Sequence, residues 1–286
     1  MTIGHLYNDF VSNLMNIYDK REASNIADWV FENVTGFNTL KRRVNETKEL
    51  AAPFQLQIQG HLQQLLLHNP VQYVLQEAWF YKMKFYVNEN VLIPRPETEE
   101  LVSWILEDVN NGNKNESLNL LDIGTGSGCI AISFKKNISG ANVTAVDISY
   151  EALAVARRNA KELQAQISFV QGDFLNEQPS YTHSRYDIIV SNPPYIPLGE
   201  KNKLSKNVTD FEPGVALFVK NDNPFIFYRA IVEFSKLYLT ATGKIYVETH
   251  EDYADEVAEI FSENNFVFKI RKDIYGKKRM IKAARK

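Results

Sequence analysis

Cysteine is almost absent from this chain of 286 residues, in which Cys129 stands alone. One cysteine cannot form an intrachain disulfide, and it excludes a metal site built from several thiolates. The five histidines, His183 among them, are scattered without the spacing of metal ligands. We therefore expect no bound metal, and we interpret Cys129 as a small buried filler rather than a nucleophile.

Long apolar runs and an excess of basic charge are also missing. No run approaches the roughly 18 apolar residues of a membrane-spanning helix, and residues 1–14 lack the apolar stretch of a signal peptide. We expect a cytoplasmic protein without a membrane partner. The 32 Lys and Arg face 35 Asp and Glu, a formal charge of -3. A dedicated nucleic-acid binder is usually basic, so direct binding of nucleic acid is not expected.

Two kinds of hydrophobic periodicity divide what is present. Residues 1–75 repeat apolar side chains at helical spacing, which predicts a small helical bundle. This domain either docks a substrate or is a structural cap. Residues 76–93 contain two short aromatic runs, 79–81 and 85–87, and a turn pattern at 88–90, which predicts a β-hairpin linking two domains.

Residues 94–286 alternate between strand and helix patterns. A polar loop is expected at 110–117. Strands are predicted at 118–123, 143–148, 167–172, 186–191, 244–249, 267–272 and 280–283. Helices are predicted at 97–109, 129–136, 150–163, 224–239 and 253–263. This alternation predicts an α/β fold with a seven-stranded, mostly parallel, Rossmann-like sheet. A short link between the last two strands predicts an antiparallel pair at one edge.

The first of these strands leads into a glycine-rich turn that opens a helix: Gly124, Thr125, Gly126, Ser127 and Gly128. Glycine permits positive φ and lets a ligand touch the backbone, while N–H groups at a helix start can face that ligand. The spacing G-x-G-x-G differs from the G-x-G-x-x-G of dinucleotide folds. It resembles the first motif of class I methyltransferases, whose turn lies under the amino acid and ribose of S-adenosyl-L-methionine.

Acidic residues end the next strands. Asp147 is placed to accept both ribose hydroxyls, with helix capping as the alternative that Ser149 could supply instead. Asp173 is expected near the adenine amine, with Phe174 against the adenine ring. Asp122 either contacts the ligand or orients the glycine turn.

The fourth strand ends in Asn192, Pro193, Pro194 and Tyr195. Two prolines remove two N–H donors and hold the Pro193 carbonyl rigidly outside the strand. The Asn192 side-chain carbonyl and the Pro193 main-chain carbonyl can together accept from both hydrogens of an NH₂ group. That grip suits methyl transfer to a planar nitrogen, because it stabilises the positive charge that develops there. Tyr195 could lie flat on the substrate; a plain strand-to-loop turn is the alternative.

A longer set of segments extends the resemblance over residues 70–280. The matching segments are V-L-I-P-R-P-E-T-E-E-L-V at 91–102, P-V-Q-Y-V at 70–74, N-P-P-Y-I-P at 192–197, F-E-P at 211–213, F-Y-R at 227–229, and Glu248, Asp273, Gly276 and Arg279. Together they resemble the N5-glutamine methyltransferases of peptide chain release factors. The resemblance implies methylation of the glutamine in the Gly-Gly-Gln motif, with the helical domain docking the factor. It implies cofactor contacts for Gly124 to Gly128, Asp147, Phe174 and Asn192, and substrate contacts for Asn192 to Tyr195.

Two rival functions remain open. A methyltransferase of an exocyclic amine in DNA or RNA would use the same grip on a flipped base. A catalytically silent cofactor-binding module would keep only the glycine turn. The resemblance favours release factors, which are protein substrates, with nucleic acid met only indirectly through the ribosome, and a monomer is expected. Residues 218–224 depart from the family's glycine-rich loop. The basic tail at 271–286 is interpreted as a solvated edge strand rather than an RNA contact.

Overall fold

The computed structural model describes residues 1–112, 117–176 and 184–286. His183 and part of the loop expected at 110–117 lie outside the described residues. The chain divides into two compact units. The first comprises Met1–Glu77 with Ser205–Phe211, and the second comprises Ala78–Leu204 with Glu212–Lys286. The domain limits expected from the sequence, 1–75, 76–93 and 94–286, stay predictions.

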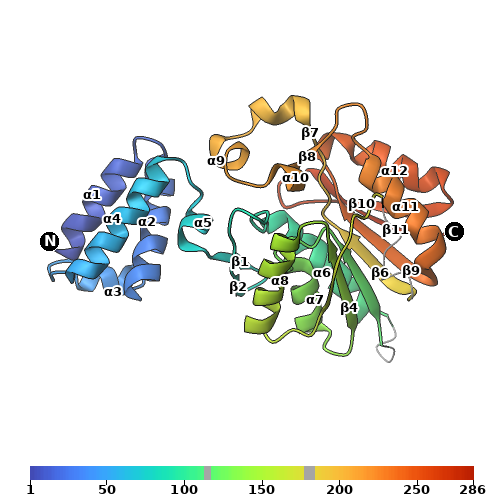
Figure 1. Cartoon of the computed structure of the whole chain (residues 1–286), viewed down its shortest axis with the longest axis horizontal. Helices are drawn as coiled ribbons and strands as arrows, with labels where there is room; N and C mark the ends of the chain where they lie inside the picture. Colours follow the sequence, from blue (N-terminus) through green and yellow to red (C-terminus); the bar gives the residue numbers. More distant parts are fainter. Residues whose placement is uncertain (113–116, 177–183) are drawn as a thin grey trace. The chain divides into compact units, whose positions relative to one another are not determined.

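The first unit is helical, and the helical bundle that the periodicity of residues 1–75 predicts is present (blue to cyan in Figure 1). Its helices are α1 (Ile3–Leu14), α2 (Lys20–Thr35), α3 (Thr39–Val44), α4 (Ala52–Leu66), α5 (Val71–Leu75) and the short α9 (Lys206–Thr209). Three begin at side-chain caps, because Thr2, Asp19 and Asn38 accept hydrogen bonds from free N–H groups of the first turn. The apolar faces of α1, α2 and α4 share one core, which includes Phe10, Phe31 and Ile58.

The second unit contains the predicted seven-stranded sheet. Its strands are β3 (Asn119–Ile123), β4 (Asn142–Asp147), β5 (Ser168–Gln171), β6 (Tyr186–Ser191), β9 (Leu239–Glu248), β10 (Phe266–Lys272) and β11 (Lys278–Arg285). They lie in the order β10-β11-β9-β6-β3-β4-β5. Neighbours from β9 to β5 are parallel, while β11 runs antiparallel to both β9 and β10. The Rossmann-like fold and its antiparallel edge are thereby confirmed.

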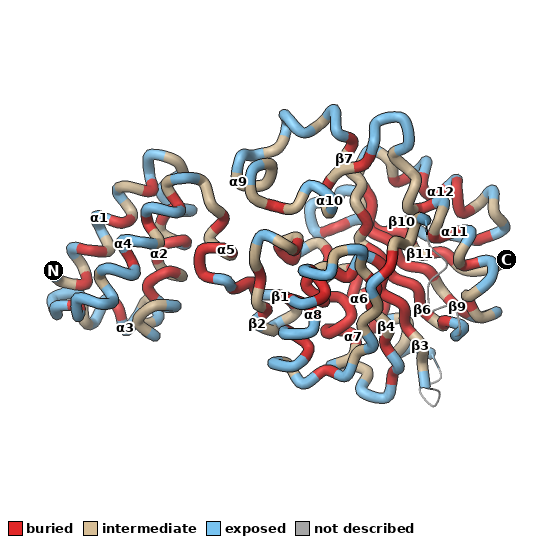
Figure 2. The backbone as a smooth tube through the Cα atoms, viewed as in Figure 1, coloured by how far each residue is buried: buried red, intermediate tan, exposed pale blue. Residues whose placement is uncertain are grey.

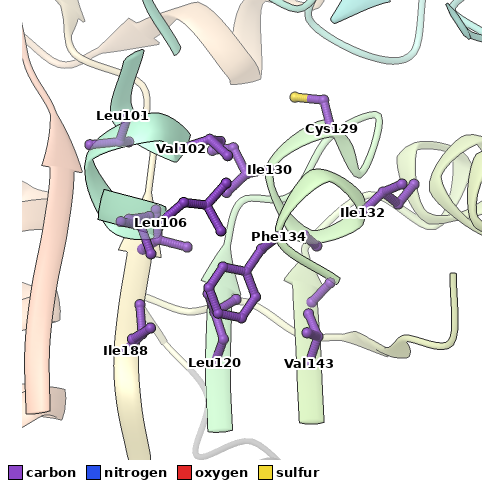
Figure 3. Packing of buried hydrophobic residues seen from close by; sticks show 14 of the residues in the cluster. Leu101, Val102, Leu106, Leu120, Cys129, Ile130, Ile132, Phe134, Val143 and Ile188 are labelled. Atoms are coloured by element: carbon purple, nitrogen blue, oxygen red, sulfur yellow. The ribbon is translucent and has the colours of Figure 1, made fainter. Parts of the chain in front are cut away.

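Helices cover both faces of this sheet. One face carries α6 (Pro96–Asn110), α7 (Cys129–Asn137) and α8 (Tyr150–Glu162), and the other carries α11 (Ile226–Tyr238) and α12 (Ala254–Glu263). The central strands are buried along most of their length (Figure 2). In Figure 3, side chains of α6 and α7 such as Leu106 and Phe134 lie over Leu120, Val143 and Ile188 of the strands. Each helix face thus buries its apolar stripe against the sheet.

Short elements complete the second unit. They are β1 (Ala78–Phe80), β2 (Met83–Phe85), β7 (Ile196–Pro197), η2 (Leu198–Lys203), α10 (Gly214–Leu217), β8 (Phe218–Val219) and η3 (Glu251–Tyr253). The predicted hairpin is present as β1 and β2, but its turn lies at Tyr81 and Lys82, both with positive φ. None of the described helices is long and apolar enough to span a membrane.

The register brings the carboxyl ends of the parallel strands together. Ile123 at the end of β3 pairs with Val146 of β4 on one side and with Ser191 of β6 on the other. Ser191 in turn pairs with Val247 of β9. Residues that follow these strands therefore meet at one edge of the sheet, where open α/β folds bind their ligands.

Candidate active site

The glycine turn joins β3 to α7 in left-handed backbone conformations. Gly124, Gly126 and Gly128 have φ of 70°, 53° and 81°. A Cβ added to Gly124 or Gly126 would meet no atom within 4 Å, whereas one on Gly128 would lie 3.0 Å from Ile132 and 3.2 Å from Ala156. The first two glycines thus leave open space above the turn, and the third permits close packing of α7 on α8.

Most N–H groups of this turn are already used inside the protein. Gly124 and Thr125 donate to the Val146 carbonyl, and Gly128 donates to the carbonyl of Thr125. Gly126 donates to Oδ2 of Asp147 at 2.8 Å. The turn therefore offers a ligand an open surface of fixed shape, and fewer donors than a free helix start would offer, because β4 takes up those donors.

Asp122 holds the turn from below. Its Oδ2 accepts from the Thr125 hydroxyl at 2.7 Å and from the N–H of Ala131. Its Oδ1 is buried and has no partner among the described residues. Burial raises the pKa of Asp122 from 3.8 to about 7. Of the two roles expected from the sequence, these contacts correspond to orienting the turn.

Two more carboxylates follow β4 and β5. Asp147 accepts from the N–H groups of Gly126 and Ser149, and burial raises its pKa above the ordinary value. Each of its oxygens keeps capacity for a second hydrogen bond, as a diol would require. Ser149 caps α8 itself through the N–H of Ala152, so Asp147 is not the cap. Asp173 accepts from Leu175 N–H and from the Asn176 side chain.

A pocket of about 240 Å³ lies over these groups, within the second unit. Predicted residues that line it are Gly124, Gly126, Asp147, Asp173, Phe174, Asn192, Pro193 and Pro194. Its remaining wall is mainly apolar and includes Leu92, Ile148 and Val215. Thr125, Ser127, Gly128 and Tyr195, also predicted as site residues, are not among the lining residues. Thr125, Ser127 and Gly128 belong to the turn beneath the pocket.

Asn192 and Pro193 stand at the pocket wall directly after β6. The strand ends at Ser191, whose hydroxyl donates to the carbonyl of Ile123 at 2.7 Å and fixes the end of β6 to β3. The Pro193 carbonyl therefore lies beyond the hydrogen-bonded ladder. Asn192 and Pro193, the two residues proposed to supply acceptors for an NH₂ group, line the same pocket.

A chain of hydrogen bonds runs behind Asn192. Its Nδ2 donates to Thr98 Oγ1 at 3.1 Å, and Thr98 Oγ1 donates to Glu248 Oε2 at 2.6 Å. The other oxygen of Glu248 accepts from the Tyr195 hydroxyl at 3.1 Å. Burial raises the pKa of Glu248, opposed by these hydrogen bonds and by the nearby Arg279. Tyr195, expected to lie on the substrate plane, is thus held by its hydroxyl, with its ring beside His250.

Three further polar residues at the site were not singled out for a role from the sequence. Thr98 lies on the apolar stripe of α6, three residues before Leu101, and Asn159 lies on that of α8. Asn159 is fully buried and donates to the Ser127 carbonyl, which ties the glycine turn to α8. Glu212 accepts from Ile93 N–H and pairs with Arg95. A polar residue at an apolar-stripe position is the signal that could have identified Thr98 and Asn159.

Cysteine and metal chemistry find no support at this site. Burial raises the pKa of the Cys129 thiol to about 12, which keeps it protonated at neutral pH. Within residues 1–112, 117–176 and 184–286, no group of three or more His, Cys, Asp or Glu side chains could hold a metal ion.

Comparisons with known proteins show a methyltransferase domain, a family of close relatives and a shared fold. Residues 103–210 match the model of the methyltransferase small domain. The release factor glutamine methyltransferase of Flavobacterium psychrophilum is 41% identical over 286 residues, covering 99% of each chain. That of Bacteroides thetaiotaomicron is 39% identical over 273 residues, covering 95% of this chain and 96% of its own. The crystal structure of a methyltransferase from Pyrococcus furiosus, 18% identical, superposes with a TM-score of 0.53 over 77% of this chain and 95% of its own, and supports the fold.

Proposed function

The chain belongs to the family of release factor glutamine methyltransferases, and from this membership we propose its reaction and substrate. It transfers a methyl group from S-adenosyl-L-methionine to the side-chain amide nitrogen, N5, of the glutamine in the Gly-Gly-Gln motif of peptide chain release factors. The observation that carries the proposal is that Asn192 and Pro193, which can supply an amide and a main-chain acceptor, line the pocket above the glycine turn.

Three observations support S-adenosyl-L-methionine as the ligand of this pocket. Space above Gly124 and Gly126 is open, so a ligand can lie against the turn. Asp147 and Asp173 place carboxylates at the pocket wall, suited to the ribose hydroxyls and the adenine amine. The ring centroid of Phe174 lies 5.5 Å from that of Phe234, and the Phe174 ring is assigned to the adenine. Thr125, Ser127 and Gly128 support the turn, and Asn192 borders both cofactor and substrate.

The chemistry requires a weak nucleophile to be activated. When bound, the sulfonium of S-adenosyl-L-methionine supplies an electrophilic methyl group and a good leaving group. The lone pair of an amide nitrogen is delocalised into its carbonyl, so the nitrogen needs alignment and desolvation. Asn192 Oδ1 and the Pro193 carbonyl accept one N–H each, which orients the nitrogen and stabilises its developing positive charge. Pro194 fixes the backbone that presents the Pro193 carbonyl. With the cofactor bound, the nitrogen held by these two acceptors would gain the methyl group as the carbon–sulfur bond breaks, and it would then lose one proton to solvent.

A folded protein is the substrate that suits the rest of the chain. We assign the helical domain, 1–75, to docking of the release factor, the segment 76–93 to the linker, and 94–286 to catalysis. The formal charge of -3 suits a protein substrate better than DNA or RNA. The protein acts as a monomer, and it meets nucleic acid only through the ribosome.

Mass spectrometry of reaction products tests this function. Purified release factor, tRNA and DNA are each incubated with the protein and S-adenosyl-L-methionine. We expect a gain of one methyl group on the glutamine of Gly-Gly-Gln alone. The Asn192→Ala variant should retain cofactor binding by calorimetry and transfer almost nothing. A methyl group on another residue, or on an exocyclic amine of nucleic acid, would overturn the substrate assignment.

A further inference from the structure

The hydroxyl of Thr98 lies between a pocket residue and a buried carboxylate. Thr98 is near the start of α6, Asn192 follows β6, and Glu248 ends β9, so three elements meet at one hydroxyl. The Thr98 hydroxyl oxygen lies 3.1 Å from Asn192 Nδ2 and 2.6 Å from Glu248 Oε2. Thr98 and Glu248 are 2% and 1% exposed, so water does not compete for these bonds.

The number of protons available fixes which group donates in each of these hydrogen bonds. A hydroxyl has one proton to donate, and a carboxylate in its charged form only accepts. Arg279 and the hydrogen bonds from Thr98 and Tyr195 favour that form of Glu248 against the effect of burial. Thr98 therefore gives its proton to Glu248, as Tyr195 does on the other carboxylate oxygen. The oxygen of Thr98 is then left to accept, so the NH₂ side of the Asn192 amide faces Thr98. The amide oxygen consequently lies on the opposite side of the group.

We propose that Thr98 and Glu248 are positioning residues that hold the Asn192 amide with its oxygen available to the substrate nitrogen. If the amide turned over, its NH₂ group would meet the substrate NH₂ group, and two donors cannot bond to each other. The orientation of a side-chain amide is not fixed by shape, because oxygen and nitrogen are nearly the same size. The polarity of its hydrogen bonds is what distinguishes the two orientations. This inference rests on the proposed function, since it assigns Asn192 to the substrate amide.

The same carboxylate also holds the far end of the turn. Glu248 binds Asn192 through Thr98 and binds Tyr195 directly. Its own main-chain carbonyl accepts from the buried hydroxyl of Tyr228, which fixes the end of β9. Both ends of the Asn192–Tyr195 turn are thereby fixed to one group, and the Pro193 carbonyl lies between them. The Tyr195 side chain thus serves the substrate indirectly.

Substitutions at Thr98 separate this role from general stability. Thr98→Val keeps the shape of the side chain and removes the hydroxyl, while Thr98→Ser keeps the hydroxyl. We expect Thr98→Val to lower kcat at least about 10-fold, with the KM for release factor and the Kd for S-adenosyl-L-methionine within about twofold of the wild type. Thr98→Ser should restore most of kcat. Glu248→Gln should resemble Thr98→Val, because the glutamine NH₂ group can donate to Thr98 and so reverse the direction of the hydrogen bonds that reach Asn192.

A matched control lies elsewhere on β9. Thr240 also donates to a carboxylate, Asp187 Oδ1, at 3.0 Å. Thr240→Val loses an equivalent hydrogen bond away from the pocket, and its kcat should equal that of the wild type. Urea unfolding of all variants shows whether a loss of kcat follows a loss of folded protein.

A double-mutant cycle and an NMR measurement complete the test. If Thr98 acts through Asn192, Thr98→Val should cost nothing further in the small residual rate of an Asn192→Ala background, measured in single turnovers with excess enzyme. Equal losses in both backgrounds, or an unchanged kcat in Thr98→Val, would overturn the positioning role of Thr98 while leaving the proposed function intact.

The side-chain NH₂ signals of Asn192, identified by their loss in Asn192→Ala, report its hydrogen bond to Thr98 without any turnover. They should move in Thr98→Val and stay in Thr98→Ser; identical spectra would refute the positioning role even if the substrate is a different one.

Discussion

Asp122 is the residue whose surroundings most disturb its chemistry. Its buried Oδ1 has no partner among the described residues, and its pKa is raised from 3.8 to about 7. Between these two values the folded protein holds a proton that the unfolded chain has lost. The free energy of unfolding therefore falls as pH rises through this window, and the loss is complete above about pH 7.

Asp122→Asn should remove this dependence, because asparagine keeps the shape of the side chain without its charge. We expect the variant to gain about 2 kcal/mol over the wild type between pH 5 and pH 8, measured by urea unfolding. The hydrogen bonds to Thr125 and Ala131 can be kept through the amide oxygen. Parallel pH profiles of the two proteins would show that Asp122 is ionised throughout.

Asp147 tests the cofactor half of the site. Asp147→Asn keeps an acceptor for Gly126 but loses the charge that strengthens bonds to hydroxyl donors. We expect binding of S-adenosyl-L-methionine to weaken about 10- to 100-fold by calorimetry, with the folded structure kept. Unchanged affinity would mean that the ribose does not contact this carboxylate.

Residue identities alone do not predict the hydrogen bonds that link Asn192, Thr98 and Glu248. The glycine turn and the Asn192–Tyr195 turn are continuous in sequence, so their patterns can be read directly. Thr98 lies 94 positions from Asn192 and 150 from Glu248. That pairing exists only because parallel strands and α6 bring their ends to one edge, and no local pattern encodes it. Glu248 is one of the residues that match the family, but the sequence does not predict which side chains it contacts.

At the scale of elements, the β3–α7 turn makes two different demands on glycine. Gly126→Ala places a methyl group in open space at φ 53°, a strain of about 1 kcal/mol. We expect a small loss of stability and at least a 10-fold weaker binding of S-adenosyl-L-methionine, since the methyl group points where the ligand would lie.

Gly128→Ala should instead lower stability strongly and affect binding of S-adenosyl-L-methionine little. Its Cβ would press on Ile132 and Ala156, so we expect a loss of about 2–4 kcal/mol in the free energy of unfolding. Calorimetric binding and urea unfolding of both variants are compared side by side. Equal effects of the two substitutions on both measurements would contradict this division of roles.

The sequence predicts all seven strands of the sheet. Most are short apolar runs between helices of clear periodicity, whereas β10 and β11 follow one another with only a short link. The linking hairpin was harder. Its turn is formed by Tyr81 and Lys82, which rarely adopt positive φ, while the turn-like residues 88–90 lie beyond β2. Packing of Phe80 and Phe85 in the core decides the register there, and local turn propensity does not.

At the scale of the whole molecule, charge separates a protein substrate from a nucleic acid. The basic tail pairs extensively with acids of the second unit: Lys277 with Glu251, Lys278 with Asp255, Lys282 with Asp108, and Arg279 with Asp273. These pairs neutralise much of the tail, which argues against an RNA contact. The prediction of an edge strand is wrong, because β11 lies between β10 and β9 and buries Met280, Ile281 and Ala283.

We expect methylation of release factor to depend weakly on salt. Its kcat/KM should fall less than about threefold between 50 and 200 mM salt, whereas binding through 6–10 phosphate contacts would fall about 10³-fold or more. Initial rates over this range provide the measurement. A steep fall would indicate that phosphate contacts carry the recognition.

The grip on the substrate nitrogen is tested most directly by a crystal structure with S-adenosylhomocysteine and release factor. We predict that the glutamine side-chain nitrogen lies about 2.7–3.2 Å from both Asn192 Oδ1 and the Pro193 carbonyl oxygen. An Asn192 amide turned away from that nitrogen, or a glutamine bound outside the pocket, would contradict it.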